Sequence, residues 1–164
     1  MKLLTIVRHG KSLWGNFELS DHDRPLKDTG IKRTKKIINF LNQRDFKPEL
    51  LLSSDAIRAF QTATMIAEGI GYPVEKIQKS STLYHASTSN IYSELFAIDN
   101  DIDSVMIFGH NPGFTDFVND FVHPKIDNLP TTGTVCIEFK TNKWENIVDA
   151  EYDVKFAVYP RMLP

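Results

Sequence analysis

The sequence predicts an α/β domain with a mostly parallel central sheet and an antiparallel edge formed by its C-terminal strands. Short apolar runs alternate with longer segments of helical periodicity over most of the chain, as expected for strands joined by crossover helices. The last segments instead alternate apolar and polar residues one by one, as half-buried antiparallel strands do. No repeat, low-complexity tract or linker interrupts the chain, so residues 1–164 are expected to form a single domain.

The first part of the chain predicts two strands, each followed by a helix. The apolar run at residues 3–7 is the first strand, and the run at 50–52 is a second, buried one. One helix is expected from about Thr29, a good N-cap, and another after Asp55, whose carboxylate can cap it. The expected inward-facing positions are Ile31, Ile38 and Leu41 in the first helix and Ala56, Phe60, Ala63, Ala67 and Ile70 in the second.

The second part continues this alternation before the pattern changes. A weaker strand is expected at residues 77–83, a helix from about Ser89, and a clear strand at 105–108. Asn111-Pro112 then has the cap-then-proline form of a helix start. The expected inward-facing positions of these helices are Ile91, Leu95 and Ile98, then Phe114, Phe117, Val118 and Phe121. The apolar positions of the two antiparallel strands are Val135, Ile137 and Phe139, then Val154, Phe156 and Val158.

Composition narrows the class of protein. Charged residues make up 24% of the chain and the formal net charge is −2, which excludes a polybasic surface for nucleic acid or anionic lipid. The single cysteine, Cys136, rules out an intramolecular disulfide framework, and its apolar neighbours favour a place in the core. The apolar run after Met1 soon meets Arg8, so it is too short for a signal peptide. We therefore expect a cytoplasmic protein with no nucleic-acid or membrane partner.

Cationic and imidazole side chains follow three of the expected strands. Arg8 and His9 come directly after the first strand. Arg58 comes shortly after the second, and His110 follows the strand at 105–108. Because the carboxyl ends of strands in an open α/β sheet form the ligand crevice, these side chains are expected to converge there. Arginine matches the geometry of phosphate oxygens and a neutral histidine can attack phosphorus, so the sequence predicts a phosphoryl-transfer site.

The same strand ends resemble the motifs of a known family. The motifs are Arg8-His9-Gly10, Ser53-Ser54-Asp55 followed by Arg58-Ala59 and Gln61-Thr62-Ala63, and Gly109-His110-Asn111. Their order makes most of the chain, through about residue 120, similar to the histidine phosphatase superfamily. That resemblance implies the phosphoglycerate mutase-like fold, a three-layer α/β/α sandwich. The short chain, Arg24-Pro25-Leu26 with Gly30, and Pro112-Gly113 after His110-Asn111 make it most similar to the SixA-type phosphohistidine phosphatases.

The resemblance implies the roles that the chemistry also selects. His9 would be the nucleophile that takes the phosphoryl group. Arg8, Arg58 and His110 would surround the transferred oxygens and stabilise their charge in the transition state. The sequence has no carboxylate cluster with the spacing of a Mg²⁺ site and no His/Cys set for zinc, so neither a metal nor another cofactor is expected.

The loop after the nucleophile departs from the family pattern. Lys11 stands where the mutases have an acidic residue, and Asn16 comes one place later after Trp14 than their asparagine does. Ser12 could nevertheless reach a phosphate oxygen and bind substrate.

The proton donor is the larger departure. Relatives that act on phosphate esters use a carboxylate to protonate the leaving alkoxide, and residues 83–87 hold no Asp or Glu. His85 could line the substrate pocket and serve instead, and Glu94 lies on the following helix. Because an imidazole is a far weaker base than an alkoxide, it can leave without such an acid. The missing carboxylate therefore favours a phosphohistidine or another N–P substrate.

Several of these residues also have simpler structural interpretations. Arg58 could be a solvated helix residue paired with Asp55, and His110 could only cap the following helix. The charged loop at residues 21–24 could be held by its own salt bridges or could lie at the pocket entrance. The cations at residues 32–36 are typical of a solvated helix face, with a docking surface for an acidic partner protein as the alternative.

Three functions fit the sequence. The favoured one is a hydrolase that removes phosphate from a protein phosphohistidine, through a phosphohistidine intermediate on His9 and without a metal; its partner would be a phosphorylated protein. The second is a phosphatase for a small phosphorylated metabolite. The third is a non-catalytic phosphate-binding scaffold, which would have no reason to keep a nucleophile together with its cationic clamp.

Overall fold

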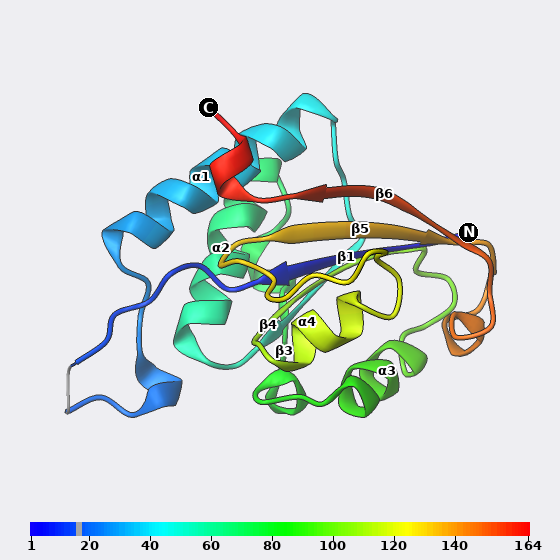
Figure 1. Ribbon diagram of the computed structural model, residues 1–164, viewed down its shortest axis with the longest axis horizontal. Coiled ribbons are helices and arrows are strands. Elements are labelled where there is room, and N and C mark those ends of the chain that lie inside the picture. Colours follow the sequence, from blue (N-terminus) through cyan, green and yellow to red (C-terminus); the bar gives the residue numbers. More distant parts are fainter. Residues whose placement is uncertain (16–17) are drawn as a thin grey trace.

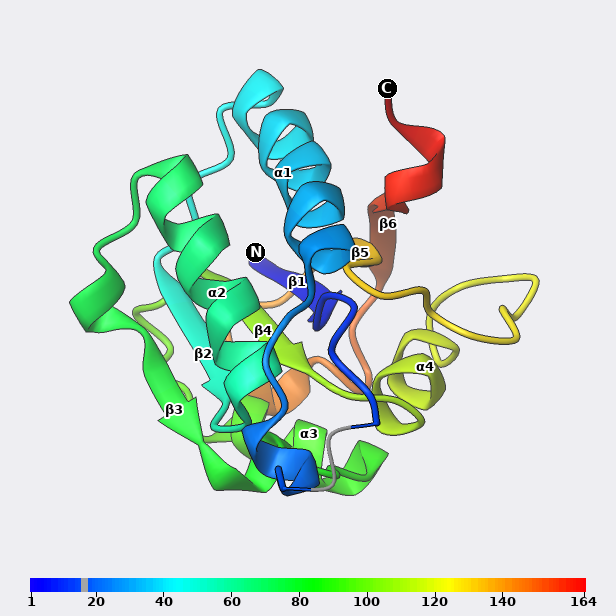
Figure 2. The same cartoon turned by 90° about the vertical axis from the view of Figure 1, so that its left-hand side faces the viewer.

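The computed structural model describes residues 1–15 and 18–164 (Figure 1). Helices cover both faces of a central sheet, which confirms the predicted α/β/α sandwich (Figure 2). The strands are β1 (Lys2–Arg8), β2 (Leu50–Ser54), β3 (Gln78–Ser80), β4 (Ser104–Gly109), β5 (Thr134–Phe139) and β6 (Tyr152–Val158). The α-helices are α1 (Asp28–Gln43), α2 (Ile57–Ile70), α3 (Thr88–Phe96) and α4 (Gly113–Val118).

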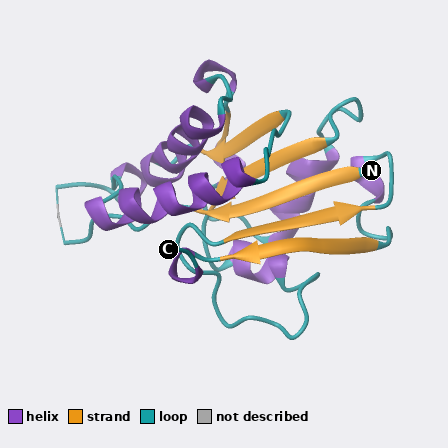
Figure 3. Cartoon of the chain, turned by 90° about the horizontal axis from the view of Figure 1, so that it is seen from above, coloured by secondary structure: helices purple, strands orange, loops and turns teal. Residues whose placement is uncertain are grey.

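The sheet is parallel at its centre and antiparallel at one edge. Its strand order is β3-β2-β4-β1-β5-β6 (Figure 3). The pairs of β2 with β3, of β2 with β4 and of β1 with β4 are parallel. β5 is antiparallel to both β1 and β6, so the two C-terminal strands form the predicted edge. A register shift between Cys136 and Ile137 interrupts the ladder of β5 with β6.

Two apolar layers hold the helices against the sheet. Residues next to each other in β4 face opposite layers, because side chains alternate along a strand. Met106 packs with Ile37 in the layer under α1 and α2. Ile107 packs with Phe114 in the layer under α3 and α4. The central strands are therefore buried on both faces, which explains why they are continuous apolar runs in the sequence.

The core-facing side of α1 differs from the prediction. Leu41 is buried as expected, but Ile31 and Ile38 are only half-buried, and Ile37 takes the central core position. Ile38 packs instead against α2, where a Cβ on Gly69 would overlap the Ile38 side chain. Ile37 and Ile38 are both apolar and lie about 100° apart around the helix, so only packing decides which of them faces the sheet.

The predicted cap of α2 is wrong. Ala56 is the N-cap residue, and its amide donates to Ser54 Oγ at 3.2 Å. The Asp55 carboxylate turns away from the helix, and its Oδ1 lies 3.0 Å from Nε2 of His22. The Ser54 hydroxyl accepts from the amide of the N-cap residue itself, so it does not replace the hydrogen bond to the first-turn amides that was expected of Asp55.

The bounds of β3, α3 and α4 differ from those expected. β3 ends where a 3-10 turn begins at residues 81–83. α3 begins one residue early, after a capping box formed by Ser87 and Asn90. α4 spans only six residues, and Asn111 Oδ1 accepts a hydrogen bond from the Thr115 amide at 3.2 Å. Across the described residues, no helix has both the length and the apolar character needed to cross a membrane.

The strand order places the predicted motifs side by side. Arg8, the last residue of β1, is the register partner of Gly109, the last residue of β4. Ser53 of β2 is the register partner of Phe108 on the other side of β4. The segments that follow these three strands therefore leave the sheet together, at the carboxyl ends of the parallel strands (Figure 3). The candidate site lies at these strand ends.

Candidate active site

A cavity of about 530 Å³ opens at the carboxyl ends of β1 and β4. Every residue that the sequence proposed for the site lines it. These residues are Arg8, His9, Ser12, Arg58, His85 and His110. The side chains of His9 and His110 are buried, and their ring centroids lie 5.0 Å apart.

The backbone around His9 fixes both its position and its tautomer. Its amide donates to the carbonyl oxygen of Gly109 at 3.0 Å, and its Nδ1 lies 2.7 Å from the carbonyl oxygen of Gly10. Because a carbonyl can only accept, Nδ1 carries the proton and Nε2 is unprotonated, with its lone pair accepting a hydrogen bond from Arg58 Nε. Burial lowers the pKa of His9 to about 3; the Gly10 hydrogen bond opposes this effect, and the charges of Arg58 and Arg8 add to it. His9 is thus a neutral imidazole, and its unprotonated Nε2 is chemically able to act as a nucleophile.

Arg58 faces this nitrogen from the first turn of α2. Its Nε lies 3.4 Å from His9 Nε2, and its side chain is buried. Its other two nitrogens donate to Asp21: Nη1 to the carbonyl oxygen at 2.6 Å and Nη2 to Oδ2 at 3.1 Å. Arg58 is therefore not the solvated partner of Asp55 that one interpretation of the sequence allowed.

Thr62 connects the nucleophile loop to α2. Its hydroxyl oxygen accepts from the Gly10 amide at 2.9 Å and donates to the Arg58 carbonyl oxygen at 2.7 Å. The Thr62 side chain is fully buried, so these hydrogen bonds form away from solvent. They hold the loop that carries His9 in a fixed position relative to the helix that carries Arg58.

Two residues of the cavity keep a buried nitrogen that has no hydrogen-bond partner among the described residues. The nitrogens are Arg8 Nε and His110 Nδ1. Arg8 Nη1 donates to the Leu129 carbonyl oxygen at 3.0 Å, and His110 Nε2 lies 2.8 Å from Ser54 Oγ, so the His110 side chain does not cap α4. Burial, together with the charges of neighbouring groups, lowers the pKa of His110 to about 2. Arg8 Nε is an N–H donor, and His110 Nδ1 is a donor in the tautomer in which Ser54 Oγ donates to His110 Nε2. Unpaired buried donors are costly, and phosphate oxygens are acceptors that would satisfy them.

Among the described residues, Asp21 is the one carboxylate that lines the cavity. No role as a proton donor was predicted for Asp21 from the sequence. Arg24 donates to its Oδ1 at 2.9 Å, and Arg58 and Tyr84 donate to its Oδ2 at 3.1 and 2.6 Å. Partial burial alone raises the pKa of Asp21, but the hydrogen bonds from Tyr84 and Arg24 and the charge of Arg58 hold that pKa well below its usual range. Asp21 is therefore ionised, and it occupies donors that could otherwise bind an anion.

Arg24 forms the wall beside Asp21. It is buried, and its Nη1 donates to Ser12 Oγ at 2.6 Å and to the Leu13 carbonyl oxygen at 2.9 Å. Its guanidinium stacks on the Trp14 ring at 3.7 Å. Both interpretations of the charged loop therefore hold, because Arg24 pairs with Asp21 and also lines the cavity. The Ser12 hydroxyl accepts from Arg24 and still has its own hydrogen to donate; Asn16 lies outside the described residues.

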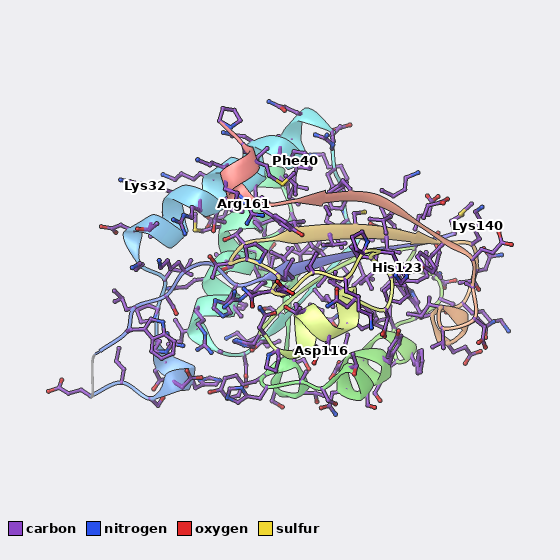
Figure 4. The ribbon with its side chains drawn as sticks, viewed as in Figure 1. Lys32, Phe40, Asp116, His123, Lys140 and Arg161 are labelled. Carbon is purple, nitrogen blue, oxygen red and sulfur yellow. The ribbon has the colours of Figure 1, made fainter. Side chains whose placement is uncertain are left out.

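The other candidates for proton transfer lie at the rim or away from the cavity. His85 is 63% exposed, and its Nε2 is 3.8 Å from Asp21 Oδ2. Glu94 accepts from Ser80 Oγ at 2.8 Å, outside the residues that line the cavity. His123 is exposed on the loop after α4 (Figure 4). Across residues 1–15 and 18–164, no group of three or more His, Cys, Asp or Glu side chains is arranged to hold a metal ion.

Sequence reasoning missed the central place of Asp21 and the contact of Tyr84. The one signal for Asp21 was its spacing of three residues from Arg24, next to the Arg24-Pro25-Leu26 segment. Tyr84 gave no such signal, because it lies 63 residues from Asp21 in the sequence. Its hydroxyl contacts Asp21 only through the tertiary position of the 3-10 turn that precedes it.

Known proteins share both the sequence and the fold of this chain. Residues 4–79 match the model of the histidine phosphatase superfamily (branch 1). An uncharacterized chloroplastic protein of Arabidopsis thaliana is 30% identical over an alignment of 152 residues, and the match covers 87% of this chain and 68% of that protein.

Two solved structures show the same fold. The protein histidine phosphatase SixA, complexed with tungstate, has a TM-score of 0.81 at 20% identity, and the match covers 98% of both chains. A mycobacterial glucosyl-3-phosphoglycerate phosphatase, complexed with VO3, has a TM-score of 0.66 at 14% identity and covers 95% of this chain and 98% of its own. The family-model match over residues 4–79 agrees with the order of the strands and with the histidines that follow β1 and β4: the chain belongs to the histidine phosphatase superfamily.

Proposed function

We propose that this protein is a phosphatase that removes phosphate from a histidine of another protein through a phosphohistidine intermediate on His9. The observation that carries the proposal is the unprotonated Nε2 of a neutral, buried His9, which accepts a hydrogen bond from the Arg58 guanidinium at 3.4 Å. A phosphoryl group bound between His9 Nε2 and Arg58 would contact both the nucleophile and a cation that stabilises its charge. The solved fold relative that acts as a protein histidine phosphatase supports this substrate class.

The reaction consists of two displacements at phosphorus. In the first, His9 Nε2 attacks, the bond from phosphorus to the substrate ring breaks, and the electron pair leaves with that ring. In the second, water attacks, the bond from phosphorus to Nε2 breaks, and the products are inorganic phosphate and free His9. The Gly10 carbonyl oxygen accepts from Nδ1 throughout, so it stabilises the positive charge that the ring carries while it is phosphorylated.

The cationic clamp stabilises the transferred oxygens. Arg58 exchanges its contacts with Asp21 for the phosphoryl oxygens, and the unpaired donors of Arg8 and His110 bind the others. Phosphoryl transfer is accelerated mainly by positioning and charge stabilisation, which these groups supply without a metal.

The leaving group decides between substrates. Asp21 is the one carboxylate among the described residues that line the cavity, and two arginines and a tyrosine keep it ionised. An ionised carboxylate cannot protonate a leaving alkoxide. A substrate imidazole needs no such acid, because it departs as a neutral ring when its other nitrogen is protonated. This difference favours a phosphohistidine over a phosphate ester.

A small phosphorylated metabolite is the second candidate. Lys11, Arg24 and Arg33 also line the cavity, and these cations could bind another anionic group of such a molecule. The mycobacterial glucosyl-3-phosphoglycerate phosphatase has the same fold.

One set of assays separates the candidates. Wild type, His9→Ala and the control His123→Ala, which changes an exposed histidine, are incubated with a phosphohistidine protein, a sugar phosphate and an aryl phosphate, each with a metal chelator. We expect the phosphohistidine protein to be hydrolysed fastest, with a loss of about a thousandfold or more in His9→Ala and none in His123→Ala. Faster turnover of the sugar phosphate would overturn the substrate assignment. Equal activity of His9→Ala would overturn the mechanism, and loss with chelator would overturn metal independence.

A further inference from the structure

A second hollow continues from the His9 cavity toward the C-terminus. Its volume is about 360 Å³, and it lies between α1 and the 3-10 turn Pro160–Met162. Arg33, Pro130 and Thr131 line both this hollow and the His9 cavity, so the two form one continuous depression. We call this second hollow the basic groove, because its charged lining residues are Arg33, Lys36 and Arg161.

The cations of the basic groove are unpaired. In the described part of the chain, no carboxylate lies within salt-bridge distance of Arg33, Lys36 or Arg161, and no carboxylate lines the groove. Lys36 Nζ has only a long contact of 3.5 Å with the Leu163 carbonyl oxygen. The Arg161 guanidinium lies 5.0 Å from the centroid of the Tyr159 ring.

In the His9 cavity, by contrast, the guanidinium groups of Arg24 and Arg58 are both paired with Asp21. The chain as a whole has a formal net charge of −2. Gathering three unpaired cations in one hollow costs repulsion, which an incoming anion relieves. Figure 4 labels Arg161 on the turn after β6, which lies against α1. Arg33 and Lys36 belong to α1.

The residues that line the groove favour a polypeptide as its ligand. A small molecule with a second phosphate group fits the lining less well. Its floor includes Tyr159 and two prolines, and apolar surface next to separated cations suits an extended chain with spaced carboxylates. A substrate phosphohistidine must reach His9 through the mouth of the cavity. The substrate residues next to the phosphohistidine then lie along the rim of the cavity, and the basic groove is a continuation of that rim. Arg33 and Lys36 are three residues apart on α1 and therefore lie along one line of that rim.

We propose that the basic groove binds an acidic segment of the phosphorylated protein substrate, next to the phosphohistidine. This inference rests on the proposed function and adds to it a specificity surface outside the phosphoryl-transfer site. The groove makes association faster and selects protein substrates with carboxylates beside the phosphohistidine.

A charge-reversal pair tests the groove. The variant Lys36→Glu/Arg161→Glu reverses two groove cations. The matched control Lys32→Glu/Lys35→Glu makes the same change in charge at two exposed positions of α1 that do not line the groove. The probe is a phosphorylated histidine-phosphotransfer protein with acidic residues around its phosphohistidine. The readout is the ratio of kcat/KM for this protein to kcat/KM for an aryl phosphate.

We expect this ratio to fall by about tenfold or more in the groove variant and by less than about twofold in the control. We also expect the groove variant to lose most of the salt dependence of kcat/KM for the protein. Thermal unfolding followed by circular dichroism verifies the fold, and Lys36→Gln and Arg161→Gln replace the double variant if it does not fold.

The failures are distinguishable. If wild type hydrolyses the phosphohistidine protein and both charge-reversed variants keep its ratio, the groove inference is wrong and the proposed function stands. If the control loses as much as the groove variant, net charge rather than the groove is responsible, and the inference is again wrong. If wild type hydrolyses only phosphate esters, the proposed function fails and the groove inference fails with it.

Discussion

Asp21 forms an ion pair with Arg58 inside the cavity that holds the nucleophile, with Asp21 Oδ2 at 3.1 Å from Arg58 Nη2. The same guanidinium contacts His9 Nε2 through its Nε. In the proposed mechanism, Asp21 therefore competes with the phosphoryl group for the Arg58 guanidinium. A carboxylate at this position keeps Arg58 oriented in the free enzyme, and it must release Arg58 when the oxyanion arrives.

Replacing this carboxylate by its amide should strengthen phosphate binding. In Asp21→Asn the competing charge and its repulsion of phosphate are gone, so we expect the inhibition constant for inorganic phosphate to fall about fivefold or more. Asp23→Asn is the matched control, because Asp23 is exposed and pairs only with His22 at 3.5 Å. Weaker phosphate binding in Asp21→Asn would contradict this prediction. It would show that Asp21 helps binding by orienting Arg58 more than it hinders binding by competing with phosphate for Arg58.

The low pKa values of His9 and His110 both predict that the folded protein becomes less stable as the pH falls. The folded protein holds both rings neutral, with pKa values of about 3 and about 2, whereas the unfolded chain protonates histidine near pH 6.5. Their stabilising effect is complete above about pH 6.5 and is lost as the pH falls toward the folded pKa values. We expect the free energy of unfolding to decrease by about 1.4 kcal/mol per pH unit for each ring below about pH 6.

Two measurements check this prediction. Chemical denaturation of wild type and of His9→Asn/His110→Asn should give a shallower pH dependence in the variant. NMR of the imidazole nitrogens should show no titration of His9 between about pH 5 and pH 8. A His9 ring that titrates near pH 6.5 would contradict the assignment of a neutral nucleophile.

Thr62 should act as a positioning residue. Thr62→Val keeps the shape but leaves the Gly10 amide without its acceptor, so we expect a loss of about 1–3 kcal/mol in the free energy of unfolding. The nucleophile loop also loses its link to α2, and we expect kcat to fall about tenfold with a smaller change in KM. Thr62→Ser should restore kcat, because it restores the hydroxyl. A Thr62→Val enzyme with unchanged kcat would assign Thr62 to stability alone.

Gly30 should be required for the packing of α1 against the nucleophile loop. A Cβ at this position would overlap the carbonyl oxygen of Lys11, which precedes Ser12 in the cavity wall. Replacing glycine by alanine inside a helix ordinarily stabilises by up to about 1 kcal/mol. Here the overlap decides the sign, and we expect Gly30→Ala to destabilise by about 1–3 kcal/mol and to lower kcat/KM. Denaturation curves check this against Lys35→Ala on the exposed face of α1; a stabilised Gly30→Ala protein would contradict it.

The expected strands and helices were largely predictable, because apolar periodicity reflects which faces are buried. The errors occurred where the sequence allows two arrangements of similar chemistry. Ile37 rather than Ile38 faces the sheet, and the Asp55 carboxylate contacts His22 rather than the first amides of α2. Such choices depend on neighbours that are distant in the sequence, so local patterns do not contain them.

The sequence by itself determined the α/β class, the motifs at three strand ends and the residue types of a phosphoryl-transfer site around His9. These features are local or follow from the order of the strands, since parallel strands bring their carboxyl ends to one edge. Only the tertiary structure decided that Asp21 occupies Arg58, that Nδ1 of His9 holds the proton, and that the cations of α1 meet Arg161. These are contacts between side chains or backbone groups whose distances are set by packing, and burial then sets their charge states.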